Sequence, residues 1–314
     1  MDLSIIIVNW KVRELLRECL SSIISFSNRD GLELIVIDNA SEDGSVEMMK
    51  NEFPKVKLIV NKENYGFGKA CNQGIGIARG RYLFILNPDT LVKGHTLENI
   101  LDFMESNPQV GIGGCYVFYP DGRPQSSFYR FPTLFSYLSR MFSLFRLLPL
   151  NRLTQKFFWE YKDNKVSGSV DRVLGGAMVL SKKMVDQIGS FDEAYFMYSE
   201  ELDLCYRARL TGWKVSTIPG TEIIHYHMQS GVQNLRNITF HSFKSDFIFF
   251  KKFYPVYKVI LIRIMQFLGI FFRTMAWGGI YLFPYSKKYY AKEKFLSYLK
   301  LLFSNFDYSK SLFL

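Results

Sequence analysis

The chain has 314 residues, which is enough for one large domain or for one domain with an appendage. Its 48% hydrophobic and 17% aromatic residues make it too apolar for a disordered protein. The net charge of +10 comes entirely from residues 231–314, where 13 basic residues outnumber three acidic ones, whereas residues 1–230 hold 26 of each. Because this basic quarter is also rich in Phe, Ile and Leu, it favours a membrane surface over a nucleic acid as partner.

The cysteines and the N-terminal segment both bear on the cellular compartment. The four cysteines are far apart and show no paired metal spacing: Cys19, Cys71, Cys115 and Cys205. They are typical of reduced thiols in a cytosolic compartment. The segment after Met1 and Asp2 lacks the basic region and the long apolar region of a signal peptide. We therefore expect the chain on the cytoplasmic side of a membrane.

Short apolar runs near the start of the chain predict buried strands. They are Leu3–Asn9, Leu32–Asp38, Val56–Val60 and Tyr82–Leu86. Apolar residues recur at helical spacing from Val12 to Ile24, between the first two runs. Strands that are apolar on both faces and alternate with helices predict an α/β fold with a mainly parallel sheet between helices. A second block, from about residue 110 to 219, continues the domain without a fixed-period repeat.

Polar or glycine-rich segments follow each predicted strand, as a nucleotide site would require. They are Asn9, Asp38–Ser45, Asn61–Asn72 and Asn87–Thr90. Ligands of open parallel sheets bind beyond the carboxyl ends of the strands. Gly66 and Gly68 would let the backbone approach a ligand, and the helix after them would offer its N-terminus to a phosphate. Asp38 can accept hydrogen bonds from a nucleobase or ribose, although such a segment also favours a simple turn.

Asp89 is a candidate metal ligand at the end of the fourth apolar run. A carboxylate there can hold a divalent metal that also binds a diphosphate. Asn87 stands where a second carboxylate would complete an Asp-x-Asp pair. His225 could be a further ligand, although a histidine after a strand usually has a structural role.

Three acids in four residues mark a candidate catalytic position. Glu200, Glu201 and Asp203 lie at the start of a predicted helix. Acids in a first helical turn interact favourably with the helix dipole, so capping explains them without any chemistry. The same cluster also suits a general base, because neighbouring acids and apolar surroundings tune its pKa.

Residues 134–158 have the pattern of a helix at a membrane surface. Apolar residues fall on one helical face, while serines, Arg140 and Arg146 fall on the other. An ordinary helix packed on the core explains the pattern equally well.

Residues 259–283 have the length of a membrane span but carry a polar stripe formed by Arg263, Gln266 and Arg273. A charge at mid-bilayer costs about 2.5–3.5 kcal/mol on insertion scales. We therefore expect one or two helices lying in the membrane interface, peripheral or monotopic, and a homodimer interface is the alternative. Flanking lysines would anchor them: Lys251, Lys252, Lys258, Lys287 and Lys288.

The motifs form an ordered succession along the chain: D-N-x-S, N-x-G-F-G-x-x-x-N, N-P-D, G-G-A, F-D-E, E-E-x-D-L-C-x-R and G-W. This succession closely resembles that of inverting family-2 glycosyltransferases with the GT-A fold, specifically the rhamnosyltransferase-like branch. The resemblance covers roughly residues 3–231. It implies a GT-A domain over residues 1–230, with a nucleotide-binding part at 1–108 and an acceptor and catalytic part at 109–230 that contains the insertion 134–158. Residues 231–314 would form a membrane-associating region.

The resemblance also implies roles for individual positions. The nucleoside would contact two residues, Asn9 and Asp38. The rest of the nucleotide-sugar pocket would be lined by Asn64, Gly66, Gly68, Asn72, Asn87 and Gly176, with Gly175 and Ala177 also bordering the donor sugar and the acceptor. Asp89 would bind Mg²⁺ or Mn²⁺, with His225 as a further ligand. Glu201 stands where the family has its catalytic Asp, and Glu200 and Asp203 are the alternatives for the base.

The implied reaction is a single displacement in which Glu201 takes the proton of the acceptor hydroxyl. A dTDP-rhamnose donor fits the branch best, and UDP-linked sugars stay open. The acceptor would be a polyprenyl-diphosphate-linked saccharide at the cytoplasmic face of a bacterial inner membrane. A nucleotidyltransferase is a second interpretation, but residues 8–15 are not the basic, glycine-rich loop that it needs. A third interpretation is an inactive membrane scaffold, because Asn87 and Glu201 both depart from the acids that the family has at these positions.

Overall fold

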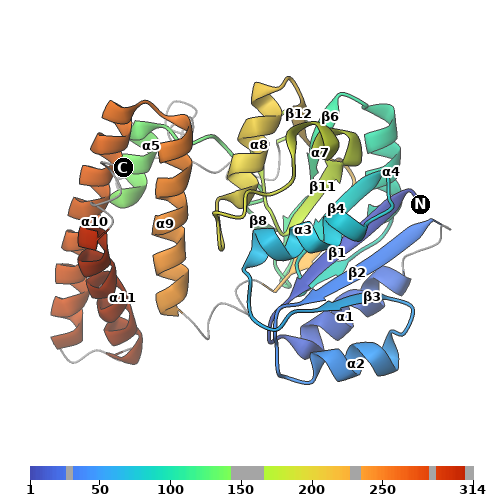
Figure 1. Ribbon diagram of the computed structural model, residues 1–314, viewed down its shortest axis with the longest axis horizontal. Coiled ribbons are helices and arrows are strands. Elements are labelled where there is room, and N and C mark those ends of the chain that lie inside the picture. The colour runs from blue at the N-terminus through green and yellow to red at the C-terminus, as the bar shows by residue number, and fades with distance from the viewer. Residues whose placement is uncertain (26–30, 143–165, 227–234, 283–287, 308–314) are drawn as a thin grey trace. The chain divides into compact units, whose positions relative to one another are not determined.

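The computed structural model describes residues 1–25, 31–142, 166–226, 235–282 and 288–307 (Figure 1). The described residues fall into two compact units. The first unit draws on Met1–Phe131, Trp159–Phe196 and Glu200–Ser230. The second draws on Pro132–Phe158, Met197–Ser199 and Gly231–Leu314.

The first unit is built on a seven-stranded sheet with the order β12-β6-β11-β4-β1-β2-β3. Its strands are β1 (Leu3–Asn9), β2 (Leu32–Asp38), β3 (Lys57–Val60), β4 (Tyr82–Leu86), β6 (Val110–Gly114), β11 (Ala177–Ser181) and β12 (Lys214–Thr217). Strands β4, β1, β2 and β3 pair in parallel, as do β12 and β6. Strand β11 runs antiparallel to both β4 and β6. The expected mainly parallel α/β architecture is confirmed.

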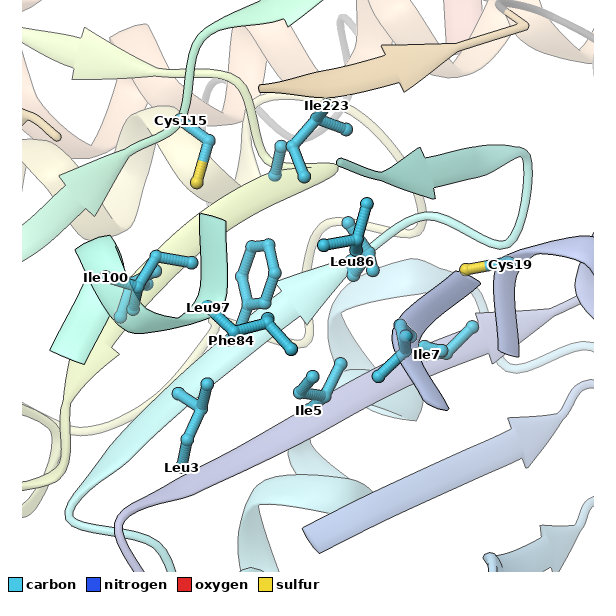
Figure 2. Packing of buried hydrophobic residues seen from close by; sticks show 14 of the residues in the cluster. Leu3, Ile5, Ile7, Cys19, Phe84, Leu86, Leu97, Ile100, Cys115 and Ile223 are labelled. Carbon is cyan, nitrogen blue, oxygen red and sulfur yellow. The ribbon is translucent and has the colours of Figure 1, made fainter. Parts of the chain in front are cut away.

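Helices cover both faces of this sheet, which explains the continuous apolar strands. They are α1 (Arg13–Ser25), α2 (Ser45–Glu52), α3 (Phe67–Ile77), α4 (Thr96–Ser106), α7 (Lys182–Ile188) and α8 (Glu200–Leu210). In β1, Ile5 and Ile7 pack in one core cluster with residues of α1, α2 and α4 (Figure 2). Ile6 points to the opposite face and packs in a second cluster with residues of α3, α7 and α8. A strand buried on both faces needs apolar residues at every position.

Two smaller sheets join segments that are distant in sequence. One has the order β5-β13-β7-β8, formed by β5 (Thr90–Val92), β13 (Ile223–His225), β7 (Val117–Phe118) and β8 (Pro124–Gln125). Its antiparallel register sets His225 opposite Thr90. The other pairs β10 (Arg172–Val173) with β9 (Phe128–Tyr129) and sets Arg172 opposite Tyr129.

The second unit is helical. Its described helices are α5 (Leu134–Met141), α9 (Leu235–Phe253), α10 (Val256–Leu282) and α11 (Lys288–Asp307). By length and composition alone, α10 could cross a membrane, and it is the one helix among the described residues that meets this criterion. The expected helix of residues 259–283 is therefore present, with its N-terminal end three residues earlier.

The polar stripe of α10 faces the interior of the second unit. Gln266 is buried, and its Nε2 donates to Tyr137 Oη at 2.7 Å. Arg273 donates to the backbone oxygen of Arg140 at 2.9 Å, and the Arg263 guanidinium lies 4.7 Å from the centre of the Phe247 ring. Apolar side chains occupy the exposed side, among them Ile260, Leu261, Ile264, Phe267, Leu268 and Phe271.

Helix α5 differs from the amphipathic pattern expected for residues 134–158. Its serines Ser136 and Ser139 are buried, while Phe135 is 47% exposed. Arg140 is ion-paired with the buried Asp246 of α9 and does not lie on a free cationic face. The polar side of α5 therefore faces the interior of the second unit. Residues 143–158 of the expected segment lie outside the described residues.

Candidate active site

Helix α8 begins with the three predicted acids, and its first turn gives each a different environment. Glu200 is 4% exposed, and its Oε2 atom is buried without a hydrogen-bond partner. Burial, reinforced by the charge of Glu201, raises the pKa of the Glu200 carboxyl well above its ordinary value of 4.5, although Arg172 opposes the shift. Burial therefore favours the protonated form of Glu200 more than in an exposed glutamate.

Asp203 has a structural environment. Its side chain is fully buried and accepts a hydrogen bond from Arg207 Nε at 2.5 Å. Tyr195 Oη donates to it at 3.2 Å. Arg207 also donates to the backbone oxygens of Ile188 and Ser190. Asp203 therefore orients the arginine that binds the loop at residues 188–190.

Glu201 is the acid of this turn that a substrate can reach. Its side chain is 14% exposed, and Oε1 lies 3.7 Å from Arg172 Nη1. A Cβ added at Gly175 would lie 3.2 Å from the Cβ of Glu201, so the glycine lets the backbone pass close to this side chain. Among the three acids, the environment of Glu201 suits a general base best, and its assignment as the base stays a prediction.

The tip of β4 holds the candidate metal ligands. Asp89 Oδ1 lies 3.2 Å from His225 Nε2, a proximity that the pairing of β5 with β13 creates. His225 Nδ1 lies 3.1 Å from Gln125 Oε1, and Asn87 Nδ2 lies 3.4 Å from His225 Nε2. A ring that donates through Nδ1 to Gln125 presents the Nε2 lone pair toward the carboxylate.

This donor set fits a divalent metal that is shared with a substrate. A carboxylate and an imidazole are ordinary metal ligands, but in the part of the chain that the structure describes no three His, Cys, Asp or Glu side chains gather as a metal site. The nearby Cys19 adds no ligand, because burial raises the pKa of its thiol to about 12. A metal held by Asp89 and His225 would need oxygen ligands from a diphosphate to complete its coordination.

The glycine pair 175–176 lies between the candidate base and the candidate metal ligands. A Cβ at Gly176 would lie 2.4 Å from Asn87 Nδ2, and the Asn87 backbone nitrogen donates to the Gly176 oxygen at 2.9 Å. Gly175 makes the corresponding close approach to Glu201. These contacts place Glu201 on one side of the dipeptide and Asn87, next to His225, on the other.

Asn9 and Asp38 lie side by side at the carboxyl ends of β1 and β2. Asn9 Nδ2 donates to Asp38 Oδ1 at 2.8 Å, and Ser41 N donates to Asp38 Oδ2 at 3.0 Å. Both carboxylate oxygens thus take part in a turn. Asn9 Oδ1, in contrast, is buried and has no hydrogen-bond partner.

The glycine-rich segment before α3 is held by its own asparagines. Asn64 Oδ1 accepts from Gly66 N at 2.9 Å, and Gly66 has a φ of 83°. A Cβ at Gly66 would lie 2.2 Å from the Phe196 oxygen, so no other residue fits there. Gly68 packs near Phe191 and Glu200, which brings α3 close to the start of α8.

The amide of Asn72 is engaged by the loop after α7. Its Nδ2 donates to the Phe191 oxygen at 2.9 Å and to Glu193 Oε1 at 3.2 Å, while its Oδ1 accepts from Phe191 N at 3.1 Å. These bonds give Asn72 a structural task. Its expected contact with a nucleotide sugar stays a prediction, as do those of Asn9, Asp38, Asn64, Asn87 and the glycines.

Arg172 belongs to this site but was not foreseen from the sequence. It is a cation between Val170 and Val173, both of which are buried. Asp171 directly precedes Arg172, so the sequence shows a pair of charged residues, and the burial of this cation beside aromatic and anionic partners becomes evident only in the fold.

The mainly parallel sheet between helices is the architecture of a GT-A fold. The sequence profile of glycosyl transferase family 2 matches residues 4–189, and the chain belongs to this family. It is therefore a glycosyltransferase.

The individual proteins to which the chain is similar share only a modest fraction of its residues. The chain is 26% identical, over 242 residues, to an N-acetylglucosaminyl-diphospho-decaprenol L-rhamnosyltransferase of Mycobacterium tuberculosis, covering 72% of this chain and 76% of the relative. Its fold is similar to that of a mannosyltransferase from Pyrobaculum calidifontis in complex with GDP-Man and Mn²⁺, with a TM-score of 0.55, 15% identity, and coverage of 96% of this chain and 86% of the other. It is also similar to GalNAc-T7 with UDP, GalNAc and Mn²⁺, with a TM-score of 0.56 and 17% identity over 71% of this chain and 43% of that longer chain.

Proposed function

We propose that the chain transfers a sugar from a nucleotide-sugar donor to a lipid-linked saccharide, with inversion at the anomeric carbon, during synthesis of a bacterial surface polysaccharide. The observation that supports this most is the position of the glycine pair 175–176 between Glu201 and Asn87. A donor lying along this pair would have its diphosphate near Asp89 and its anomeric carbon toward Glu201.

Glu201 would act as the general base. It would take the proton from the acceptor hydroxyl as that oxygen attacks the anomeric carbon. Because attack comes from the side opposite the departing nucleoside diphosphate, one displacement inverts the configuration. The longer Glu side chain reaches one methylene further than an Asp, and the close approach of Gly175 provides room for it.

A divalent metal, Mn²⁺ or Mg²⁺, would neutralise the charge that develops on the departing diphosphate. Asp89 and His225 would hold it, with Asn87 beside them. The presence of Mn²⁺ in two structures with a similar fold supports this assignment. Since the described residues offer two ligands at this position, Asp89 and His225, we expect the metal to bind weakly until a donor supplies phosphate oxygens.

The nucleoside would bind at the carboxyl ends of β1 and β2. Asn9 Oδ1 is a buried acceptor without a partner, which is costly unless a ligand satisfies it. A nucleobase N–H or a ribose hydroxyl offers the missing donor. Asp38 lies next to this atom and would share the contact.

The donor and acceptor are inferred from the relative that transfers L-rhamnose to an N-acetylglucosaminyl-diphospho-decaprenol. We propose dTDP-rhamnose as the donor, with another dTDP- or UDP-linked sugar as the nearest alternative. The acceptor would be a polyprenyl-diphosphate-linked saccharide. Because such a lipid resides in the membrane, a transferase at the membrane surface can reach its acceptor.

Helix α10 supports a peripheral location at the cytoplasmic face of the inner membrane. Its exposed side is apolar, and its polar stripe is satisfied inside the second unit. Lys251 and Lys252, near the start of α10, are exposed and would lie against anionic headgroups. In this proposal residues 231–314 associate with the membrane and residues 1–230 carry the transferase chemistry.

Sugar transfer by the purified full chain tests the proposal. Labelled dTDP-rhamnose and UDP-sugars would be offered with a polyprenyl-diphosphate-linked N-acetylglucosamine, with Mn²⁺ or with a chelator. We expect Mn²⁺-dependent transfer that falls about 100-fold or more in Asp89→Ala, by analogy with removal of a transition-state charge stabiliser.

Asp121→Ala is the matched control, because this exposed carboxylate pairs with a surface arginine, Arg123, and its loss should leave transfer unchanged. Transfer of a nucleotidyl group, or Mn²⁺-independent sugar transfer that Asp89→Ala leaves intact, would contradict the proposal.

A further inference from the structure

Two buried polar atoms near the start of α8 have no hydrogen-bond partner, Glu200 Oε2 and Arg172 Nε. Glu201 is next to Glu200 in the chain and forms an ion pair with Arg172. We propose that Arg172 is a positioning residue that holds the negative charge of this acid pair on Glu201, so that Glu201 is ionised and Glu200 is neutral. The inference rests on the proposed role of Glu201 as the general base.

The fold fixes the position of the Arg172 guanidinium before any substrate binds. Arg172 belongs to the two-residue strand β10, whose partner strand β9 sets Tyr129 opposite it. The guanidinium lies 4.3 Å from the centre of the Tyr129 ring, and the Arg172 side chain is 11% exposed. A cation stacked on an aromatic ring loses little rotamer freedom when it pairs with an anion.

The charges around Glu201 favour one ionised carboxylate. Two adjacent carboxylates with little access to water resist simultaneous ionisation. Arg172 contacts Glu201 at 3.7 Å, whereas burial raises the pKa of the neighbouring Glu200 and favours its protonated form. The cation therefore stabilises the anion on the side chain that is 14% exposed, where an acceptor hydroxyl can reach it.

The other titratable groups near the pair are uncharged thiols or are occupied elsewhere. Burial raises the pKa of Cys205 on α8 to about 12 and also raises that of Cys71 on α3. Asp203, two residues after Glu201, is fully buried and ion-paired with Arg207. The charges of Arg172 and Arg207 both oppose the raised pKa of Cys205, and that of Arg172 also opposes the raised pKa of Glu200.

Removing the charge of Arg172 tests the proposal through the pH dependence of sugar transfer. In Arg172→Met, loss of the cation makes ionisation of Glu201 harder, so the acid limb of the kcat profile should move up by about one pH unit or more. At a pH below that limb, the rate should fall about 10-fold, while KM for the donor stays unchanged. Arg172→Lys keeps a positive charge and should restore most of the original profile.

Arg209→Met is the matched control. Arg209 also lies over an aromatic ring, Phe131 at 5.9 Å, and pairs with an acid, Asp171 at 3.2 Å, but this acid has no proposed catalytic role. Its loss should leave the pH profile in place. A uniform loss of rate in Arg172→Met at every pH, with an unmoved acid limb, would show that Arg172 only supports the fold and would overturn the proposal.

A second measurement does not depend on activity. Carbon-13 spectra of carboxyl-labelled glutamate, assigned with Glu200→Gln and Glu201→Gln, report the charge of each side chain at pH 7. We expect one neutral and one ionised carboxyl, with the Glu201 signal moving toward the neutral position in Arg172→Met. Two ionised carboxyls, or no change in the variant, would overturn the proposal even if the chain transferred no sugar at all. An absence of transfer combined with the expected spectra would count against the proposed function alone.

Discussion

At the scale of single residues, one turn of α8 shows how position decides what an acid can do. Glu200, Glu201 and Asp203 have the same charge in an unfolded chain. In the fold, Glu200 is buried and has a raised pKa, Glu201 is partly exposed and paired with Arg172, and Asp203 is ion-paired with Arg207. Only an ionised and accessible carboxylate can take a proton from an acceptor, which is why Glu201 is our choice for the base.

The raised pKa of Glu200 leads to a prediction about stability. Above pH 4.5 the unfolded chain releases the Glu200 proton while the native chain keeps it. The native state then binds more protons, so this group lowers stability as pH rises from 4.5 toward its native pKa. Glu200→Gln removes that loss, worth about 1.4 kcal/mol for each unit by which the native pKa exceeds the unfolded one.

Chemical denaturation at pH 5 and pH 8 measures this effect. The difference in unfolding free energy between the two pH values should be smaller in Glu200→Gln than in the parent. Glu193→Gln, at a site where the acid makes an exposed hydrogen bond with Asn72, is the control and should not alter the difference. If the unfolding free energy changed between pH 5 and pH 8 by the same amount in the parent and in Glu200→Gln, Glu200 would be ionised in the native protein and the prediction would be wrong.

The sequence predicted the identity of these residues better than their environments. Asp89 and His225 were both expected as ligands, and the structure brings them within 3.2 Å. Arg172 was missed, because its effect depends on a two-residue strand pairing with Tyr129 that has no periodic signature. The engagement of Asn72 by the Phe191 loop also depends on a contact between segments 119 residues apart, which sequence spacing does not reveal.

At the scale of elements, the strands were predictable because burial on both faces demands continuous apolar runs. Strands β1, β2 and β4 have the expected bounds, and β3 begins one residue later at Lys57. The short strands β5, β7, β8, β9, β10 and β13 were not resolved from the sequence, since two or three residues carry too little pattern. These short strands nevertheless bring together the candidate metal ligands and place Arg172 beside Glu201.

Helix α3 provides a prediction about packing. A Cβ at Gly74 would lie 2.6 Å from Ile6 Cγ2 and 2.9 Å from Ile37 Cδ1, so the glycine lets α3 approach β1 and β2 closely. Gly74→Ala should therefore destabilise the protein by about 1–3 kcal/mol, as overpacking does. Because α3 carries the glycine-rich segment, donor affinity should fall as well.

The same helix contains its own control. At Gly76 an added Cβ would meet nothing within 4 Å, so Gly76→Ala should raise stability by up to about 1 kcal/mol through helix propensity. Urea denaturation of both variants measures the two effects. Equal stability changes in the two variants would mean that the helix does not pack as closely as described.

At the scale of the whole molecule, charge and apolar surface are unevenly distributed between the ends of the sequence. Residues 231–314 carry the entire net charge of +10, and α10 exposes apolar side chains along one side. The sequence predicts an apolar helix with a polar stripe, but it does not reveal that Gln266 donates hydrogen bonds to Tyr137 and to the backbone oxygen of Phe243 inside the unit. Because the polar stripe lies inside the unit, the exposed side of α10 is apolar and suits a lipid interface.

Binding to lipid vesicles tests the role of this face. The double variant Ile264→Gln with Phe267→Gln removes two exposed apolar side chains, each worth about 1.5–3 kcal/mol when fully buried. We expect binding to anionic vesicles to weaken at least about 10-fold, since each 1.4 kcal/mol is a factor of ten. Sedimentation with vesicles at several lipid concentrations gives the affinity.

The control replaces apolar residues that are comparably exposed elsewhere. Ile77 and Leu210 belong to the first unit and are 41% and 67% exposed. Ile77→Gln with Leu210→Gln should leave vesicle binding unchanged. Unaltered binding in the α10 variant, with a loss of dimer in light scattering, would instead identify this face as an interface between two copies of the chain.

The central claim is that Glu201 activates the acceptor for a single inverting displacement. The most direct test follows sugar transfer by proton NMR, at saturating donor, acceptor and Mn²⁺, in the parent and in Glu201→Gln. We predict a product whose anomeric configuration is opposite to that of the donor, and a rate that falls by about 100-fold or more in the variant while donor binding persists. Retention of the donor's configuration, or a Glu201→Gln variant as fast as the parent, would contradict the claim.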